Sequence, residues 1–308
     1  MNTVRLGVVF LISFLITLSL IPLLISFSIK KKLYDDPKGD ELKVHPIPIP
    51  YLGGIGILIG YMVPFLFFLV ACEHTEKLWV ILMGGILIII LGMWDDMKNI
   101  SPFIRLSWQL LVALLTIYLG VRIGTFSAYY LTIPITVVYI LGSINSLNLI
   151  DGLDGLAGGV ISISLIGFCL LFYFQGKPIY LVISLAMLGA VLGFLPYNFN
   201  PAKIFLGDNG STFLGYMIAI LAVNASTKPY DLTSFFVSLF LIGLPIIDTA
   251  SAIIRRWLGQ RPIFGGDRSH IYDWLAGRGF SVKKTVLICY SIQILLVSSG
   301  IVLFWVSE

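Results

Sequence analysis

The chain has 308 residues, of which 58% are hydrophobic and 12% are charged, with a net charge of +4. Soluble domains usually carry about 25% charged residues, so this composition excludes a single water-soluble core. The cysteines Cys72, Cys169 and Cys289 have neither metal-ligand spacing nor a pairing pattern, and we interpret them as small buried hydrophobic residues. Nothing in the sequence predicts a nucleic-acid partner.

Apolar runs recur along the whole chain, and a helix needs about 20 such residues to cross a bilayer. We predict an all-α, polytopic membrane protein of about ten transmembrane helices, forming one domain over residues 1–308. The first run, Leu6 to Ile29, is expected to be a span and not a removed leader, because no small-residue cleavage site follows it. The predicted spans are roughly 5–29, 51–72, 78–94, 104–121, 127–146, 156–175, 179–197, 211–226, 232–254 and 284–306.

The basic residues predict the orientation in the membrane. Fifteen of the 20 lysines and arginines belong to one alternate set of connections, and five belong to the other set. Cytoplasmic loops carry such an excess, so we expect the first set to be cytoplasmic and both termini to face outward. That set comprises the connections near 30–50, 95–105, 145–155, 198–210 and the basic loop at 255–284.

Most of the acidic residues fall on the same side, twelve of the 16 in all. Acids contribute little to topology, so the positive-inside bias does not explain them. An acid near hydrocarbon costs roughly a few kcal/mol unless it is paired, hydrated or metal-bound. The cluster therefore predicts a site for a cation, or for a cation together with a phosphorylated ligand.

The first polar motif runs from Lys43 to Gly54. Its alternating prolines predict an extended segment at the membrane edge that would aim Lys43 and His45. Gly53 and Gly54 permit the close approach of a backbone or a ligand. A plain proline-rich linker is the alternative interpretation.

The second motif is the pair Asp95-Asp96, directly after the third predicted span. Adjacent carboxylates repel each other unless a cation or an arginine offsets them, and Arg105 is placed to face them across the turn. The macrodipole disfavours acids at a helix C-terminus, which favours a functional role over an ordinary acidic loop.

The third motif places Asn145, Asn148 and Asp151 three residues apart, so that on a helix they share a face. Asp151 and Asp154 are each followed by glycine, which permits tight turns. These hard oxygen ligands suit Mg²⁺ or Mn²⁺ better than zinc. A capped helix start is the alternative.

Two more segments complete the set. Glycines, Asp208, Ser211 and Lys203 before the eighth span suit a phosphate-and-metal site at a helix N-terminus, and capping by Asp208 and Ser211 is the alternative. In the basic loop, His270 is a candidate for phosphate contact or proton transfer, although a lone loop histidine is more often incidental. The clustered arginines of that loop also suit anionic membrane lipids.

Together the five segments resemble the polyprenyl-phosphate N-acetylhexosamine-1-phosphate transferase family, glycosyltransferase family 4. The matched pieces, in the family's order, are K-x-H-x-x-P-x-P-x-x-G-G, D-D, N-x-x-N-x-x-D-G-x-D-G-L-A, F-x-G-D-x-G-S and D-R-x-H. The resemblance implies that a polyprenyl phosphate attacks the sugar-bearing phosphorus of a UDP-sugar and releases UMP. It also implies an active site in cytoplasmic loops that requires Mg²⁺ or Mn²⁺.

The resemblance carries roles to individual positions. The implied metal ligands are Asn148 and Asp208. The acidic centre would comprise Asp95, Asp96, Asp151 and Asp154, with the first two beside the lipid phosphate. The candidate substrate contacts are Lys43, His45, Arg105, Asn145, Asn198, Asn200, Arg268 and His270, with Asn198 or Asn200 near the uridine.

The basic loop reads His270-Ile271-Tyr272-Asp273, without the further histidines that relatives commonly carry. This departure weighs against the muramoyl-pentapeptide branch. It favours the branch that transfers N-acetylglucosamine phosphate to undecaprenyl phosphate, the first plasma-membrane step of a cell-envelope polysaccharide. The sequence leaves open the hexosamine, a homodimer, and whether attack is direct or passes through a covalent aspartyl intermediate.

Two other functions remain as alternatives. An ion-coupled transporter would use the acids as a cation path, but transporters hold such charges near the midplane, often within two repeats. A lipid-binding scaffold without catalysis would tolerate substitution of the acids.

Overall fold

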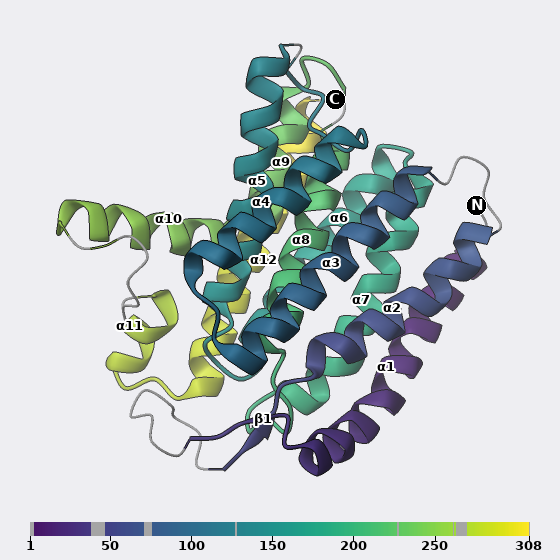
Figure 1. Ribbon diagram of the computed structural model, residues 1–308. Coiled ribbons are helices and arrows are strands. Elements are labelled where there is room, and N and C mark those ends of the chain that lie inside the picture. Colours follow the sequence, from purple (N-terminus) through teal and green to yellow (C-terminus); the bar gives the residue numbers. More distant parts are fainter. Residues whose placement is uncertain are drawn as a thin grey trace.

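A computed structural model describes residues 3–37, 47–70, 76–126, 128–226, 228–260, 262 and 270–307. The helices are α1 (Thr3–Lys31), α2 (Gly53–Val70), α3 (Glu76–Lys98), α4 (Pro102–Tyr118), α5 (Tyr129–Ile150), α6 (Leu156–Phe174), α7 (Pro178–Asn198), α8 (Gly207–Ala225), α9 (Leu232–Leu241), α10 (Gly243–Leu258), α11 (Ile271–Gly277) and α12 (Val282–Ser307). Two short strands, β1 (Tyr34–Asp35) and β2 (Ile49–Pro50), pair antiparallel. The protein is therefore a helical bundle with one small hairpin (Figure 1).

Within the described residues, six helices are long and apolar enough to cross a membrane: α1, α3, α5, α6, α7 and α12. The bent pair α9–α10 brings the number to seven if it is one span, while α2 and α4 are shorter apolar helices. The predicted polytopic membrane fold is confirmed. A helix lies at each predicted span. By length and composition, however, six or seven of the described helices could cross a membrane, and not the ten that were predicted.

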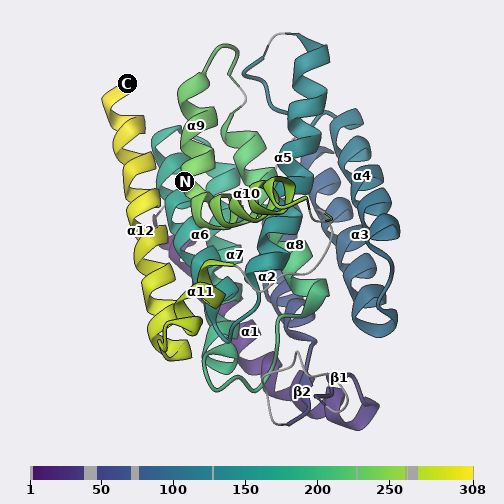
Figure 2. The same ribbon diagram turned by 90° about the vertical axis from the view of Figure 1, so that its left-hand side faces the viewer.

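The predicted ninth span, 232–254, is not one straight helix. α9 ends at Leu241, α10 begins at Gly243, and the two helices are bent by 83° at the break. Gln293 of α12 satisfies the freed backbone groups, because its Oε1 accepts from Leu244 N at 3.0 Å and its Nε2 donates to Leu241 O at 2.8 Å. α10 consequently leaves the bundle sideways (Figures 1 and 2).

α8 lies at the centre of the bundle. Every residue from Asn209 to Ala225 is buried, and α2, α3, α5, α6, α7 and α9 contact this helix. Lys177, which precedes α7, donates to Asn224 O at 2.6 Å and to Ala225 O at 3.2 Å, so an ammonium group sits at the C-terminus of α8. This charge complements the helix macrodipole.

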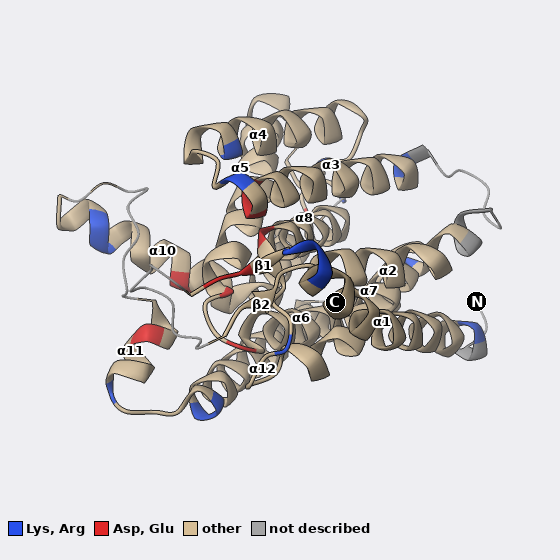
Figure 3. Cartoon of the chain, turned by 60° about the horizontal axis from the view of Figure 1, so that its bottom comes forward, with Lys and Arg blue, Asp and Glu red and all other residues tan. Residues whose placement is uncertain are grey.

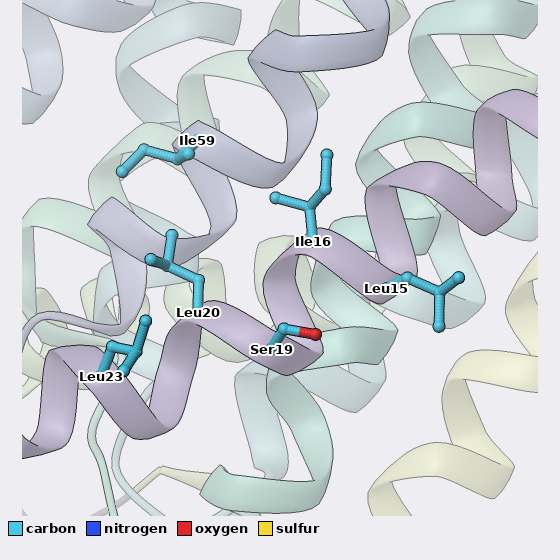
Figure 4. A pocket seen from close by; sticks show the side chains of 6 residues that line it. All are labelled: Leu15, Ile16, Ser19, Leu20, Leu23 and Ile59. Carbon is cyan, nitrogen blue, oxygen red and sulfur yellow. The ribbon is translucent and has the colours of Figure 1, made fainter.

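The outer face of α1 and α2 is apolar. A shallow hollow of about 450 Å³ opens there, and Ser19 is its one polar lining residue (Figure 4). Leu15 and Leu23, which line it, are 48% and 66% exposed. The hollow contains no charged side chain, and we interpret it as part of the lipid-facing surface. The apolar lining residues are Leu15, Ile16, Leu20, Leu23 and Ile59.

The described acidic residues gather mainly at one end of the bundle, as predicted (Figure 3). Phe205 N donates to Pro50 O at 2.7 Å, which joins the segment before α2 to the loop before α8. The hydroxyl of Tyr272 in α11 donates to Leu149 O at 3.2 Å, which joins the basic loop to the end of α5. Which face of the membrane this end occupies stays a prediction.

Candidate functional site

Asp96 at the end of α3 caps the N-terminus of α8. Its Oδ1 accepts from Asp208 N at 2.8 Å, and its Oδ2 accepts from Asn209 N at 3.1 Å and from Asn209 Nδ2 at 2.6 Å. Leu206, the N-cap residue of α8, provides no side-chain hydrogen bond of its own. A carboxylate from another helix therefore satisfies the amides that a helix start leaves unpaired.

Two glycines allow neighbouring helices to approach this helix start. A Cβ at Gly92 of α3 would overlap the backbone of Asn209, and a Cβ at Gly54 of α2 would overlap Asn209 and Gly210. The amide of Gly54 also donates to Leu206 O at 3.0 Å. The close approach predicted for Gly53-Gly54 is confirmed, and the group that approaches is protein backbone.

Asp208 and Asn148, the predicted metal ligands, lie in direct contact. Asn148 Nδ2 donates to Asp208 Oδ1 at 2.6 Å and to Ser211 Oγ at 2.9 Å. The last turn of α5 is thereby joined to the first turn of α8. Because Asp96 provides the cap, the Asp208 carboxylate is directed at Asn148 and is not used to cap α8, the alternative that the sequence left open.

Asp95 and Arg105 form the ion pair that the sequence predicts. Arg105 Nε lies 3.1 Å from Asp95 Oδ2, although the N–H is poorly directed for a hydrogen bond, and Asp95 is buried. The other oxygen of Asp95 accepts from Ile100 N at 3.0 Å, closing the turn between α3 and α4. Arg105 Nη1 also lies 3.5 Å from Asn148 Oδ1, which places its charge beside the Asn148–Asp208 contact.

Asp151 lies in the turn between α5 and α6 and adds negative charge to this region. Burial, followed by the charges of Asp208, Asp96 and Asp154, raises the pKa of its carboxyl well above the ordinary value. Three carboxylates near the α8 N-terminus thus act on Asp151. Such an arrangement favours binding of a cation, which would relieve the repulsion.

Asp154 and Asn200, predicted to be catalytic and substrate-binding, contact each other. Asp154 Oδ2 accepts from Asn200 Nδ2 at 2.9 Å and from Ala202 N at 3.0 Å. These bonds brace the loop between α7 and α8 against the turn after α5. Both residues are half-buried, and their roles toward substrate stay predictions.

The other predicted asparagines also contact protein groups. Asn198 is buried, accepts from Gly155 N at 3.0 Å and donates to Ile204 O at 3.0 Å, so both ends of its amide are used. Asn145 donates to Gln109 Oε1 at 2.7 Å, about one helical turn from Asn148. Asn198 therefore supports the site's loops in this structure, and its predicted place near the uridine remains untested.

His270 is held by a residue that the sequence reasoning did not select. Asp248 Oδ2 lies 2.6 Å from His270 Nδ1, Asp248 Oδ1 accepts from Ile271 N at 2.8 Å, and the paired side chains are almost fully buried. The His270 ring stacks on Tyr272, whose hydroxyl contacts Leu149 O. His270 is therefore tied to the end of α5 that carries Asn148.

Three predicted substrate contacts lie outside the described residues: Lys43, His45 and Arg268. Three contacting residues were missed as site components: Gln109, Asn209 and Asp248. Ser211, which the sequence placed in the phosphate-and-metal segment, contacts Asn148. Asp248 had a detectable signal, since an acid in a predicted membrane span is a functional candidate by default. Gln109 and Asn209 gave no comparable signal, because their partners are distant in sequence.

The oxygen donors near the α8 N-terminus suit Mg²⁺, which proteins seldom surround completely with their own ligands. Among the residues that the structure describes, no group of three or more His, Cys, Asp or Glu side chains is arranged to hold a metal. Mg²⁺ commonly uses one or two carboxylates and completes its shell with water and substrate phosphates. Asp208 and Asn148 each carry a hard oxygen donor, and their side chains are in contact. Nδ2 of Asn148 faces Asp208 here, so ligation of one ion by both residues would require the Asn148 amide to turn.

Comparisons with known proteins give consistent results. Residues 78–226 match the family model for glycosyl transferase family 4. The chain is 38% identical to a probable undecaprenyl-phosphate N-acetylglucosaminyl 1-phosphate transferase of Bacillus subtilis strain 168, over 97% of this chain and 85% of the relative. It is 31% identical to a decaprenyl-phosphate N-acetylglucosaminephosphotransferase of Mycobacterium tuberculosis strain CDC 1551 / Oshkosh, over 81% of this chain and 71% of the relative. A phospho-N-acetylmuramoyl-pentapeptide-transferase of Geobacillus sp. strain WCH70 is also 31% identical to this chain, over 94% of this chain and 95% of the relative.

Proposed function

The chain belongs to glycosyl transferase family 4, and from this premise we propose that it transfers N-acetylglucosamine 1-phosphate to a membrane polyprenyl phosphate. The donor is a UDP-sugar, the acceptor is undecaprenyl phosphate or a close analogue, and UMP is released. The names of the relatives support the sugar and the lipid class. The observation that carries the proposal within the structure is the Asn148–Asp208 contact at the capped N-terminus of α8, at the polar end of a membrane bundle.

We further propose that Asn148 and Asp208 hold Mg²⁺ or Mn²⁺. A divalent ion at this position would neutralise the charge of the nucleotide diphosphate and of the departing UMP. The raised pKa of Asp151 supports this assignment, because burial and the charges of Asp208, Asp96 and Asp154 disfavour a further negative charge there, and a cation would offset that.

The chain's own groups supply binding and orientation for the transfer. An oxygen of the lipid phosphate forms a bond to the sugar-bearing phosphorus, and the bond between that phosphorus and the oxygen of UMP breaks. Arg105, held by Asp95, stands beside the Asn148–Asp208 contact, where a guanidinium can bind a phosphate group. Such transfers depend mostly on positioning and electrostatic stabilisation.

Asp95 as a general base remains a hypothesis of this proposal. The lipid phosphate is ionised near neutral pH, so the step needs no strong base. Both Asp95 oxygens have partners in the protein, Arg105 and Ile100 N, which supports a role for Asp95 in holding Arg105. One diphosphate linkage replaces another, so the reaction should be readily reversible.

We place the site on the cytoplasmic face of the plasma membrane, with both termini outside, on the strength of the basic residues. The product would enter a cell-envelope polysaccharide. The comparisons give no support to an ion-coupled transporter. A homodimer is compatible with this proposal but not required by it.

Isotope exchange tests the proposed function directly. Purified protein with undecaprenyl phosphate, Mg²⁺, labelled UMP and UDP-N-acetylglucosamine should move label from UMP into the nucleotide sugar. Exchange should stop with a chelator, without the lipid, and in the Asp208→Asn variant. Asp231→Asn is the matched control, because Asp231 caps α9 at the opposite end of the bundle and touches none of these groups.

The outcomes separate the parts of the proposal. Exchange that requires metal, lipid and Asp208 supports the reaction, the sugar and the metal ligand together. Exchange with another UDP-sugar alone would retain the reaction and change the sugar. No exchange with any nucleotide sugar, from protein that unfolds with a normal thermal transition, would contradict the proposed activity.

A further inference from the structure

Asp248 lies in α10, just after the bend between α9 and α10, and it contacts the start of α11. α10 is the helix that leaves the bundle, and Asp248 is buried although its side chain is acidic. Its two oxygens have different partners: Oδ1 accepts from the backbone amide of Ile271, and Oδ2 contacts His270 Nδ1 at 2.6 Å. The carboxylate therefore fixes both the start of α11 and the imidazole ring beside it.

The ring of His270 is held from a second side. Tyr272 stacks on it with centroids 5.5 Å apart and planes inclined by 6°. The hydroxyl of Tyr272 donates to Leu149 O at 3.2 Å, and a Cβ at Gly152 would overlap that hydroxyl. The chain of contacts thus runs from α10 through His270 to the turn between Asn148 and Asp151.

We propose that Asp248 is a positioning residue, which fixes the tautomer and orientation of His270 for the transfer reaction. The inference rests on the proposed function and adds to it a residue that the motifs do not contain. A carboxylate accepts hydrogen bonds and donates none, so Nδ1 must carry the proton that faces Asp248. Any contact of the imidazole with a substrate phosphate or with a transferred proton then runs through Nε2.

Asp248→Asn is the informative substitution because it reverses this arrangement with little change in shape. The amide oxygen can still accept from Ile271 N, while its NH₂ group then faces Nδ1 of His270. Nδ1 must become the acceptor, and the proton moves to Nε2. Asp248→Glu keeps an acceptor-only carboxylate and should keep the original tautomer.

Nitrogen NMR of the histidine rings measures the tautomer. The chain has three histidines, so ¹⁵N-histidine labelling gives few signals, and His270→Gln identifies those of His270. We expect protonated Nδ1 in the original protein and in Asp248→Glu, and protonated Nε2 in Asp248→Asn. Asp273→Asn is the matched control, because the Asp273 carboxylate accepts from the backbone N of His270 and lies on the same short helix.

Isotope exchange measures whether the tautomer matters. Asp248→Asn should lower kcat/KM on the order of 10–100-fold, as loss of a carboxylate that orients a functional histidine typically does. Asp248→Glu should retain more activity than Asp248→Asn. Combining Asp248→Asn with His270→Gln should lower kcat/KM no further than His270→Gln alone, because the first residue acts through the second.

Each result has one meaning. An unchanged tautomer in Asp248→Asn, or a changed tautomer with full exchange activity, overturns the inference. So do fully additive effects, which would mean that Asp248 acts independently of His270. If the original protein exchanges no label at all, the proposed function fails instead, and the NMR result alone still decides whether Asp248 sets the tautomer.

Discussion

Asp95 and Asp96 are adjacent in sequence but have different partners. Asp96 accepts three hydrogen bonds from the first turn of α8, whereas Asp95 faces Arg105 and the turn before α4. On a helix, neighbouring side chains point in directions about 100° apart, so one carboxylate is turned to α8 and the other to α4. The pair therefore combines a structural role with a site role.

This difference can be tested by substituting the two residues separately. Asp96→Ala leaves the partly buried amides of Asp208 and Asn209 without their acceptor, and a fully buried group of this kind costs roughly 1–3 kcal/mol. We expect a lower thermal unfolding temperature in detergent and lost exchange activity. Asp95→Asn should retain most of the stability and lose activity mainly through Arg105. Equal unfolding temperatures for Asp96→Ala and the original protein would contradict the capping role.

At this scale the sequence predicted which residues would come together but not what each would contact. The three-residue spacing put Asn148 on the face that carries Asp151, and the expected meeting of Asn148 with Asp208 is found. The sequence did not indicate that Asp96 caps α8, nor that Asp248 holds His270. Those contacts join residues 112 and 22 positions apart, and no local spacing rule reaches so far.

Among the helices, α3 and α8 approach each other closely at Gly92, near the end of α3 that carries the two aspartates. A side chain at Gly92 would overlap the backbone of Asn209, and backbone cannot move aside as the end of a flexible side chain can. The contact brings the end of α3, with its two aspartates, to the start of α8. The geometry of the site is consequently set by helix packing as well as by the polar groups.

Gly92→Ala should therefore separate the two helices. Overpacking of this kind typically costs about 1–3 kcal/mol. We expect a lower unfolding temperature and weaker exchange. Gly142→Ala is the matched control, because Gly142 lies in α5 with no heavy atom near its missing Cβ. That substitution should be neutral or slightly stabilising, since alanine favours helix more than glycine does. Identical behaviour of the two variants would contradict the packing argument.

Hydropathy located the helices well but could not detect the bend between α9 and α10. The break is stabilised by Gln293, which lies about 50 residues later in α12 and completes the hydrogen bonds of both helix ends. The sequence of 232–254 is apolar throughout its first part and so was predicted to be one span. Only the three-dimensional contact shows why the chain can turn there.

At the scale of the whole molecule, the gathering of the acidic residues at one end gives the protein two chemically different ends. The motif order and the alternation of short turns predicted this arrangement correctly. The membrane face that each end occupies follows from the positive-inside rule and is accessible to a direct test.

Cysteine labelling provides that test. In a background with the three native cysteines replaced by serine, Lys98→Cys and Lys228→Cys place single thiols at opposite ends, and both lysines are exposed. A membrane-impermeant maleimide should label the Lys228 position in intact cells and the Lys98 position only after permeabilisation. The reverse pattern would contradict the predicted orientation.

The central position of α8 has a consequence for how the protein is made. This helix is long enough to span a membrane, but its polar first turn and Asn224 keep it out of the six helices that are apolar enough. A segment of this kind partitions poorly into lipid by itself, since its polar groups would lack partners there. α2, α3, α5 and α7, which contact it, all precede it in the chain and are synthesised first. We therefore expect insertion of α8 during translation to depend on helices that are already in the bilayer, so that a truncated chain beginning just before Gly207 would fail to integrate it.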